Sequence, residues 1–547
     1  MLRILPLAFA LLIVPWGAAA PSLVGTEAGP VKNVCADPRT VLEAQPCARW
    51  ISRANAGELS THGAIAVSPD GTLVVATGKG QTSACGSQCF VGISGMDMLT
   101  VAYDAKTGAR RWSATYGGSG DFVDVGMAVA FDPSGTRVYV GGFVYSAGTG
   151  YDEALLAYDA ATGAPAWSRV ESRFPEGDLE LVNALAVAPD GRVFAASSAF
   201  GTGESARLAV YDGATGTRLG HADFPRTLLW DVVRSDEQVV VVGGRAPSAG
   251  QSLAPFVQAL DPQLLPSWSA SLAVSGRAFA SRVALAGERV LVAGNAADAL
   301  GHHDFVAAAL DAATGQVQWL ERHAASGRMN DAAVAGGSFV LAGEALSANG
   351  NGSVHRTIAY SVEDGSVRWM QSHGSGAALD AAHGIAASAD GSFVVVTGES
   401  QSAALRSGLL SCSPISLPEE ACAPTSDVFT VAYRASDGAV LWKAALDGAG
   451  RGDDVGLAVA LSGSAVYVGG HLSGTGAGCL ASISYTLQGR EERVCAGPQR
   501  LCAGPGDCLM SPARQDAFLL RYDATAAAAQ NGPVQRVSER DHPPARL

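Results

Sequence analysis

The chain has 547 residues, more than a single compact core normally uses, so several domains or an array of repeats are expected. Its formal charge is −14, with 37 lysines and arginines against 51 aspartates and glutamates. This balance argues against a nucleic-acid-binding protein, which needs a basic stripe to offset phosphate charge, and against a polybasic membrane anchor.

The N-terminal segment, MLRILPLAFALLIVPWGAAAP, has one arginine, a short apolar run and then small residues. This layout predicts a secretory signal peptide over residues 1–19, cut after Ala19 because Pro21 disfavours a cut after Ala20. An uncleaved anchor is the alternative, although the run is short for a membrane span. We expect a secreted, periplasmic or cell-surface protein, in which residues 20–48 form an N-terminal extension.

One structural unit recurs along the chain from residue 49 to residue 524. Each copy has a first strand, a tight turn of Pro-Asp-Gly type, a valine-rich second strand, a third strand, a Thr-Gly turn and a fourth strand that carries Trp. The third strand is expected to end at Tyr103, Tyr158, Tyr211, Leu260, Leu310, Tyr360, Tyr433 and Tyr522. The chain is therefore predicted to be all-β, as a single β-propeller of eight four-stranded blades. Seven blades remain an alternative if the unit around Leu260 is degenerate.

The two ends of the repeat array are out of phase. The array begins with a lone Trp strand around Trp50, and its last unit, ending near Tyr522, has no such strand. Pairing these two segments would close the ring and remove two exposed sheet edges. We predict this closure, and we expect a disordered tail over residues 525–547.

The third-to-fourth strand turns carry a recognisable motif: Asp, two residues, Thr-Gly and then Trp. It is complete in three units, at Asp104, Thr107, Gly108 and Trp112; at Asp159, Thr162, Gly163 and Trp167; and at Asp311, Thr314, Gly315 and Trp319. The units resemble the repeats of pyrroloquinoline-quinone-type (PQQ-like) propellers. The resemblance covers the chain from Trp50 to Asp523. In physical terms, Asp can accept hydrogen bonds from turn amides, Gly permits a positive φ, and Trp can pack against the next blade. The motif therefore indicates fold and not function.

The resemblance also implies a possible enzyme, a PQQ-dependent quinoprotein dehydrogenase with calcium. Those enzymes carry adjacent cysteines near the quinone, and no Cys-Cys occurs here, nor a Cys-x-x-Cys-His haem attachment site. Their metal ligands and catalytic Asp have no recognisable counterparts in this sequence, and the stacking Trp cannot be distinguished from the docking set. We therefore assign no catalytic, cofactor-binding or metal-binding residue, and keep the dehydrogenase, or another propeller enzyme, as the alternative.

Ten cysteines occur, in clusters: Cys35, Cys47, Cys85, Cys89, Cys412, Cys422, Cys479, Cys495, Cys502 and Cys508. Behind a signal peptide they predict local disulfides; zinc is less favoured because Cys85 and Cys89 lack a second close pair. Eight of them lie in three long insertions between second and third strands, at 79–97, 399–427 and 471–515. If first strands line the centre, these insertions share one face, which we predict to bind a protein or small-molecule partner.

Aspartates recur on the same predicted face, either as a calcium or substrate ring or as loop-fastening acceptors, which we favour. One set precedes the third-strand ends and the other precedes first strands: Asp97, Asp152, Asp304, Asp427 and Asp516; Asp124, Asp380 and Asp454. His302 and His303 precede Asp304 and are interpreted as solvated loop residues. The sequence thus favours a non-catalytic propeller that acts as a binding scaffold.

Overall fold

The computed structural model describes residues 31–32, 50–54, 60–81, 95–174, 178–201, 204–297, 303–347, 350, 352–374, 379–401, 426–447, 453–473, 480–481, 495–496, 515–523 and 535–538. Every regular element within these ranges is a β-strand. The all-β prediction is therefore confirmed. No helix in this part of the chain is long and apolar enough to cross a membrane.

Consecutive strands form four-stranded antiparallel units, which we number in chain order as blades 1 to 8. Blades 1 to 4 are β3 (Ser60–Val67), β4 (Leu73–Gln81), β5 (Met96–Asp104), β6 (Arg110–Tyr116); β7 (Val125–Phe131), β8 (Arg137–Ser146), β9 (Gly150–Asp159), β10 (Pro165–Glu171); β11 (Leu179–Val187), β12 (Arg192–Phe200), β13 (Ser205–Asp212), β14 (Arg218–Pro225); and β15 (Thr227–Arg234), β16 (Val239–Arg245), β17 (Ala254–Leu260), β18 (Pro266–Ser271). Blades 5 to 8 are β19 (Ala278–Ala286), β20 (Arg289–Ala297), β21 (His303–Asp311), β22 (Val317–His323); β23 (Met329–Ala335), β24 (Ser338–Leu346), β25 (Ser353–Ser361), β26 (Val367–His373); β27 (Asp380–Ala387), β28 (Phe393–Ser400), β29 (Asp427–Arg434), β30 (Val440–Asp447); and β31 (Val455–Ser462), β32 (Ala465–Ser473), β35 (Gln515–Asp523), β2 (Trp50–Ala54).

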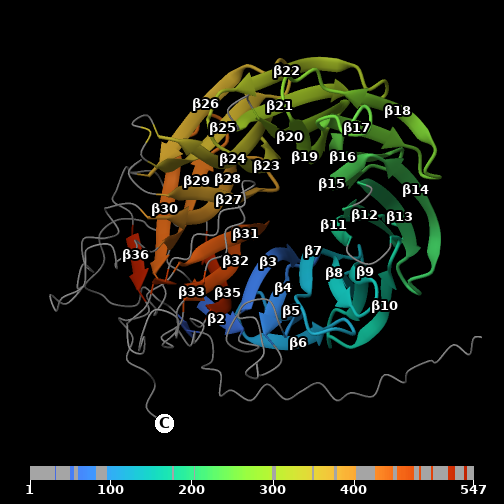
Figure 1. Ribbon diagram of the computed structural model, residues 1–547. Coiled ribbons are helices and arrows are strands. Elements are labelled where there is room, and N and C mark those ends of the chain that lie inside the picture. The colour runs from blue at the N-terminus through green and yellow to red at the C-terminus, as the bar shows by residue number, and fades with distance from the viewer. Residues whose placement is uncertain are drawn as a thin grey trace, which may run out of the picture.

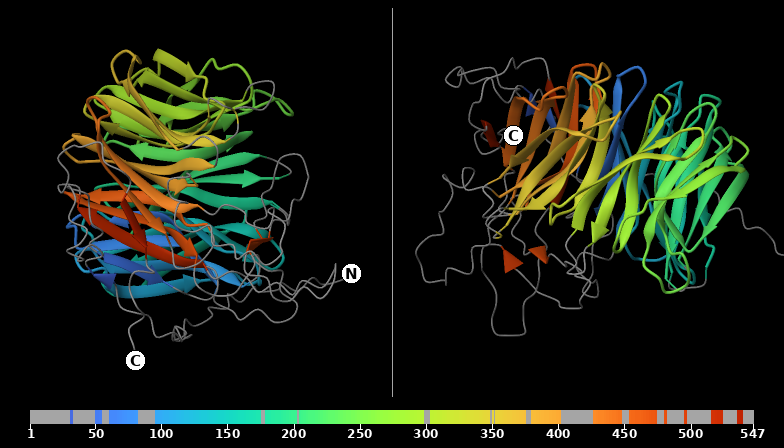
Figure 2. Two further views of the ribbon diagram at one scale, coloured as in Figure 1. Left: turned by 90° about the vertical axis from the view of Figure 1, so that its left-hand side faces the viewer. Right: turned by 90° about the horizontal axis from the view of Figure 1, so that it is seen from above.

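The blades are arranged in a ring around a central opening (Figure 1). The first strand of each blade contacts the first strands of both neighbours, and this cycle returns from β31 to β3. The fourth strands lie at the rim, so strand order runs from centre to rim as the sequence analysis assumed. Seen from the side, the sheets lie next to one another and together form a disc (Figure 2). The structure is thus a multi-blade β-propeller.

The tight turn between first and second strands explains why each chain reversal is so short. In blade 1, Gly71 has φ 69°, and Asp70 accepts hydrogen bonds from the amide and hydroxyl of Thr72 at 3.0 and 2.9 Å. Gly391 of blade 7 has φ 68° at the equivalent position. Gly adopts this left-handed conformation without a Cβ penalty, and Asp supplies the acceptor that an open turn needs.

The ring closes where the ends of the array meet. Strand β2 pairs antiparallel with β35, with Trp50 opposite Arg521 and Ala54 opposite Ala517. Trp167 of blade 2 lies opposite Ala157, one residue before the third-strand Tyr, and Trp50 has the same position relative to Tyr522. The predicted closure is confirmed, with the N-terminal segment as the fourth strand of blade 8. Blade 8 in turn contacts blade 1, where the Tyr467 hydroxyl of β32 donates to the carbonyl of Ala105 at 3.2 Å.

Each of the eight first strands contains a β-bulge at one equivalent point near its start. The bulged residues are Gly63, Met127, Asn183, Trp230, Ser281, Asn330, His383 and Leu457. A bulge increases local twist and leaves one residue out of the ladder. Eight bulges at one level therefore form a ring around the opening, at the end of the propeller where second strands lead into third strands.

Two further strands extend the outer edges of neighbouring blades. Strand β1 (Val31–Lys32) pairs with β2 of blade 8, and β36 (Gln535–Ser538) pairs in parallel with β30 of blade 7. The last of these lies in the tail expected to be disordered, and these four residues pair as a strand. A short pair, β33 (Leu480–Ala481) and β34 (Cys495–Ala496), lies within the 471–515 insertion.

Several expectations concern residues that fall outside the described ranges. These are the signal peptide at 1–19, all of the 20–48 extension except Val31 and Lys32, and nearly all of the three insertions. All cysteines except Cys495 also fall there, so the disulfide prediction stays a prediction.

Candidate functional site

The Trp of the repeat motif docks one blade onto the next in five of the blades. The indole N–H of Trp112 donates to the carbonyl of Ala160 at 2.8 Å, and Trp167 reaches Gly213 at 2.9 Å in the same way. The equivalent pairs are Trp268 with Ala312, Trp319 with Val362, and Trp369 with Ala435. These five tryptophans and Trp442 are at most 9% exposed, so each contributes about 2–3 kcal/mol of apolar burial, and the first five add a hydrogen bond.

The Gly of the motif leaves space for the indole of the preceding blade, which lies against its backbone. Gly163 has φ 72°, and a Cβ there would lie 2.5 Å from Cδ2 of Trp112, too close for any carbon. The same close approach joins Gly216 to Trp167 and Gly315 to Trp268. Asp159 completes the turn, accepting from the amide and hydroxyl of Thr162 at 2.9 and 2.7 Å. The prediction of a blade-docking motif is confirmed in geometry.

Blade 4, which lacks Thr-Gly, keeps the same turn by another route. Leu264 has φ 67° and replaces the glycine, while Asp261 accepts from the amides of Gln263 and Leu265 at 2.9 and 2.8 Å. Its Trp268 still docks on blade 5. The unit around Leu260 is therefore a complete blade, not a degenerate one.

The recurring aspartates mainly fasten loops. Asp124, which is fully buried, accepts from the amides of Gly118 at 2.8 Å and Tyr145 at 2.5 Å. Asp380 accepts from the Ser400 hydroxyl at 2.5 Å and from the amide of Gln401 at 2.9 Å. Burial raises the pKa of Asp124 to about 7, against the effect of its two amide donors. These contacts support the loop-fastening interpretation for this set.

The third-strand set has similar roles where its contacts are described. Asp152 accepts from the Thr149 hydroxyl at 2.7 Å, and Asp304 accepts from Arg322 at 2.8 Å and from the amide of Ala325 at 3.2 Å. His303 opens β21, opposite Ala297, while residue 302 lies outside the described part. Asp97, Asp427, Asp454 and Asp516 lie in or next to strands β5, β29, β31 and β35. Among described residues, no three His, Cys, Asp or Glu side chains form a group suited to a metal ion.

The three long insertions leave one face of the ring within three consecutive blades. They connect β4 to β5 in blade 1, β28 to β29 in blade 7, and β32 to β35 in blade 8. Because second strands run toward the same face in every blade, the strand ends at Gln81, Ser400 and Ser473 lie on that face. We call this part of the ring the insertion sector.

A polar cluster lies at the strand ends of blades 7 and 8, within the insertion sector. The Glu399 carboxylate of β28 receives a 3.3 Å contact from Nε2 of His383, the bulged residue of β27, and a 2.8 Å hydrogen bond from the Ser426 hydroxyl. The Ser426 amide donates in turn to Asp453 at 3.1 Å. Burial alone would raise the pKa of Glu399, but the donors His383 and Ser426 outweigh it and hold the pKa below its ordinary value. Burial raises the pKa of Asp453.

The second strands supply this cluster at one register position. In each second strand, one residue pairs with the first-strand residue just before the bulge; it is Gly in seven blades and Ser197 in blade 3. The residue that follows it is titratable in four consecutive blades and neutral in the other four. The titratable residues are Glu344, Glu399, His471 and Lys79, and the neutral ones are Phe143, Ser198, Gly244 and Asn295. The neutral side chains of Ser198 and Asn295 bind the backbone of the next blade, at Leu229 and Met329. Three of the ionisable residues therefore lie within the insertion sector, and Glu344 lies in blade 6 beside it.

The Glu399 cluster combines a Ser, a His and a carboxylate, yet it is not arranged as a hydrolase triad. A nucleophilic Ser must donate to the imidazole, which then donates to the carboxylate. Here the Ser426 hydroxyl donates directly to Glu399, and Ser426 is fully buried. The arrangement binds the strand ends of blades 7 and 8 together and offers partly exposed His383 and Glu399 side chains, each 25% exposed, at the edge of the opening.

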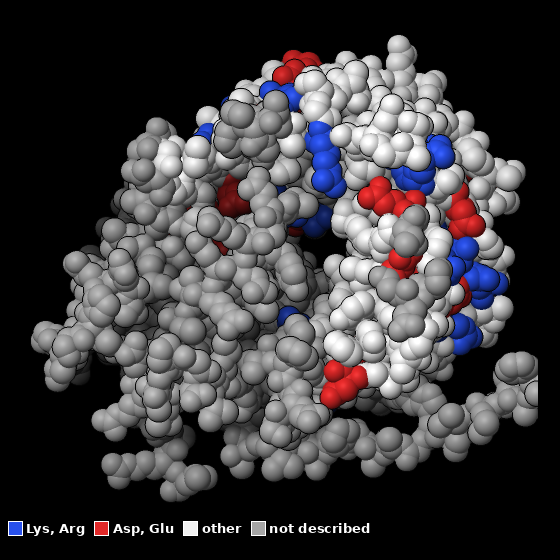
Figure 3. Space-filling model, in the orientation of Figure 1, with Lys and Arg blue, Asp and Glu red and all other residues white. Residues whose placement is uncertain are grey.

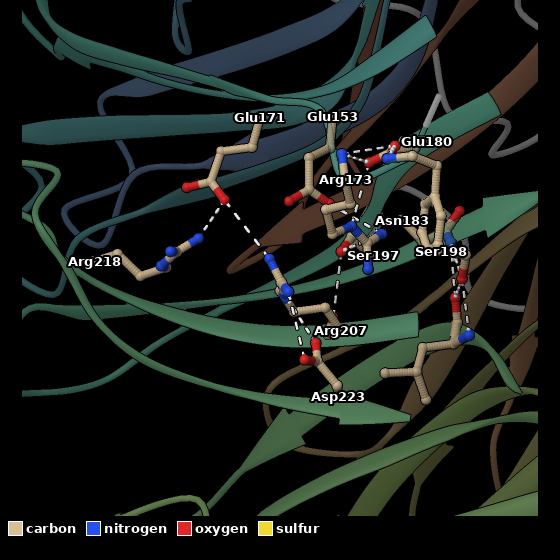
Figure 4. A network of polar contacts seen from close by, with 12 residues as sticks. Glu153, Glu171, Arg173, Glu180, Asn183, Ser197, Ser198, Arg207, Arg218 and Asp223 are labelled. Carbon is tan, nitrogen blue, oxygen red and sulfur yellow. Dashed lines mark hydrogen bonds and ion pairs between the residues drawn. The ribbon is translucent and has the colours of Figure 1, made fainter. Parts of the chain in front are cut away.

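A second polar network joins blades 2 and 3 (Figure 4). Arg207 of β13 lies between Asp223, at 2.8 Å, and Glu171, at 3.8 Å, and Arg218 also pairs with Glu171. Deeper in the same interface, Arg173 pairs with Glu153 at 3.3 Å and with Glu180 at 3.2 Å. Glu180 also accepts from the amides of Arg173 and Phe174, both at 2.8 Å.

This network borders a cavity of about 10 Å³ lined by Glu153, Glu171 and Tyr211, a volume on the order of one water molecule. Burial raises the pKa of Glu153 although Arg173 opposes it. Every acidic group drawn has a basic partner, with four carboxyl groups sharing three guanidinium groups, so the network holds the two blades together. Over the face drawn in Figure 3, acidic and basic side chains are interspersed around the ring.

The described residues do not fit a quinone site. A bound quinone needs a flat aromatic face and a set of metal ligands beside it. Five of the six motif tryptophans hydrogen-bond to the next blade, and Trp442 contacts the ring of Tyr522 at 5.5 Å. Trp230 lies between Phe200 and Phe279, with ring centroids 5.7 and 6.1 Å away. No described metal-ligand group accompanies any of them.

The fold and the docking motif define a β-propeller of PQQ-like repeats. The model of the family described as outer membrane protein assembly factor BamB matches residues 46–246, 97–371 and 256–525, and the chain belongs to this family. The resemblance drawn from the motif is thereby confirmed. No curated protein sequence matches the chain.

Several solved structures are similar at low identity. The quinohemoprotein alcohol dehydrogenase from Comamonas testosteroni is 14% identical over 89% of this chain and 78% of that one, with a TM-score of 0.46. A europium-containing methanol dehydrogenase is 13% identical over 82% and 87%, with a TM-score of 0.42. The computationally designed Ika8 protein is 16% identical over 76% and 95%, with a TM-score of 0.45. Identities this low assign this chain no activity.

Proposed function

We propose that the protein is a secreted or cell-envelope propeller that holds a partner protein on its insertion sector and performs no chemistry of its own. One observation carries the proposal: the chain's three long insertions leave the same face in consecutive blades 7, 8 and 1. Loops that a rigid scaffold presents together are where proteins disproportionately place binding residues. The family description, which names an outer-membrane assembly factor, supports a role in holding another envelope protein.

Site-directed photocrosslinking tests the face. Leu379 precedes β27 beside the insertion of blade 7, where the Gln401 amide donates to its carbonyl at 3.2 Å. Its side chain is 61% exposed. Leu265 is 64% exposed in a third-to-fourth strand turn on the opposite face and is a matched control. A photoreactive residue at 379 is expected to crosslink to one discrete partner in cells, and the same residue at 265 to none. Equal crosslinking at both positions contradicts the proposal.

Reconstitution tests the enzymatic alternative. Purified protein mixed with pyrroloquinoline quinone and calcium is expected to show no retained quinone absorbance after gel filtration and no dye reduction with alcohols. Retained quinone together with dye reduction would overturn the scaffold assignment, whatever the crosslinking shows.

A further inference from the structure

The outer strand of blade 7 differs in its burial from the outer strands of blades 1 to 6. Ala445 lies opposite Phe429, four residues before the third-strand Tyr433, and is 0% exposed. The equivalent residues of six other blades are half-buried or exposed: Thr115, Val170, Asp223, Ser271, Arg322 and Ser372. Val170, for example, is 40% exposed.

The sequence of this strand agrees with its burial. Ala444, Ala445 and Leu446 are consecutive apolar residues, all buried, where other blades carry Arg322 or Ser372. Ala444 and Leu446 pack into the core shared with blade 8, while Ala445 points to the other side of the sheet. An apolar, flat outer edge is a template for a further strand, and proteins normally cover or charge such edges.

A further strand does lie on this edge. Residues of β36 pair in parallel with β30, with Ala445 opposite Arg536 and Leu446 opposite Val537. The described outer strands of blades 1 to 6 carry no fifth strand. A parallel strand added at the edge obtains its affinity from main-chain hydrogen bonds, which is the mode of extended-peptide recognition by sheet edges.

We propose that the outer edge of β30 is a strand-acceptor site whose resident occupant is the chain's own segment Gln535–Ser538, and that this segment is exchangeable for an extended peptide of the same sequence. The site is on the outer rim of blade 7, whereas the insertions leave from the loops between second and third strands. Four residues bury little surface, so the pairing is weak enough to open while the propeller stays folded.

The test uses the full chain with two paired variants. Replacing Arg536→Pro and Val537→Pro together removes both amide donors, whereas Arg536→Ala with Val537→Ala keeps them. Hydrogen exchange of the amides of residues 444–447 is expected to quicken by about tenfold or more in the proline variant and to stay near wild type in the alanine variant. Exchange at Ser372 and His373, on the uncovered edge of blade 6, is the internal control.

A labelled peptide of residues 531–540 then tests exchange. It is expected to bind the proline variant, to slow exchange at residues 444–447, and to bind wild type at least about tenfold more weakly because the edge is occupied. Unchanged exchange in the proline variant overturns the acceptor site. Protection in wild type that disappears on dilution would assign the occupying strand to a second copy and overturn the proposed occupant.

Discussion

At the residue scale, the interface between blades depends on glycines whose missing side chain makes room for an indole. The Gly163 position demands both a positive φ and space for Trp112, so two separate costs fall on any substitution there. The space, and not only the backbone angle, explains why Gly recurs next to Trp in this repeat.

The two costs can be separated by experiment. Gly250 has φ 77° and open space around it, so Gly250→Ala is expected to cost about 1 kcal/mol from the backbone alone. Gly163→Ala adds the displacement of Trp112 and is expected to cost at least about 3 kcal/mol. Urea unfolding followed by Trp fluorescence measures both variants. Equal losses would show that the contact with Trp112 adds nothing.

His62 gives a prediction about pH. It is fully buried on β3, with Nε2 at 3.0 Å from the Tyr103 hydroxyl, and burial lowers its pKa from 6.5 to about 3. Below pH 6.5 the unfolded chain gains a proton here that the folded chain does not, so this residue's contribution to stability falls as pH falls from about 6.5 toward 3.

His62→Gln cannot titrate, so its stability relative to wild type is expected to improve by about 2 kcal/mol between pH 7.5 and pH 5. Urea midpoints at the two pH values provide the measurement. Because only the difference between variant and wild type is used, other titrating groups cancel. A relative stability that stays constant with pH would mean that His62 remains accessible to protons in the folded state.

At the element scale, the strand that closes the ring supplies the third prediction. Ser52 lies in the middle of β2 opposite Leu519 and is 7% exposed. Ser52→Pro is expected to destabilise the closure by about 3 kcal/mol or more and to yield oligomers, because both sheet edges at the junction become available. Ser52→Ala keeps the amide and is the matched control. Light scattering after gel filtration distinguishes monomer from oligomer, and a monomeric, fully stable proline variant contradicts the assignment.

The strands could be predicted from the sequence because most repeats contain their own turn and strand-end residues. The third-strand end at Tyr158 and the turn at Gly163 are local signals that recur along the chain and predicted the blades, and the lone Trp strand at Trp50 predicted the closure. Strands β1 and β36 carry no such signal, since they are two and four residues long and pair with edges formed by distant segments.

The polar clusters were missed for a different reason. Glu399 and His383 look like ordinary strand residues, and only the shared register across blades 6 to 8 and 1 reveals that such residues gather in one sector. Comparing the residue at this one second-strand position in all eight repeats would have found this asymmetry. The pairing of Arg207 with Glu171 depends on how two blades face one another, which no single repeat encodes.

At the scale of the whole molecule, the ring and its insertions are expected to be separable. In blade 7 the described residues end at Gln401 and resume at Ser426, whose amide donates to Asp453. Replacing residues 402–425 with a short Gly-Ser linker is therefore expected to leave the thermal midpoint within about 2 °C of wild type. The same variant is expected to lose crosslinking from position 379. A fall of several degrees would make the insertion part of the folding core instead.

The junction between β2 and β35 also has a consequence for biogenesis. A ribosome makes residue 50 long before residue 520, so the ring can close only after all eight units have been synthesised. Until then the nascent arc of blades has two flanks, one at each end, whose sheets are unpaired and exposed. A product truncated before residue 515 would not be a smaller propeller; it would be an unsealed arc, recognisable to proteases and chaperones by those flanks.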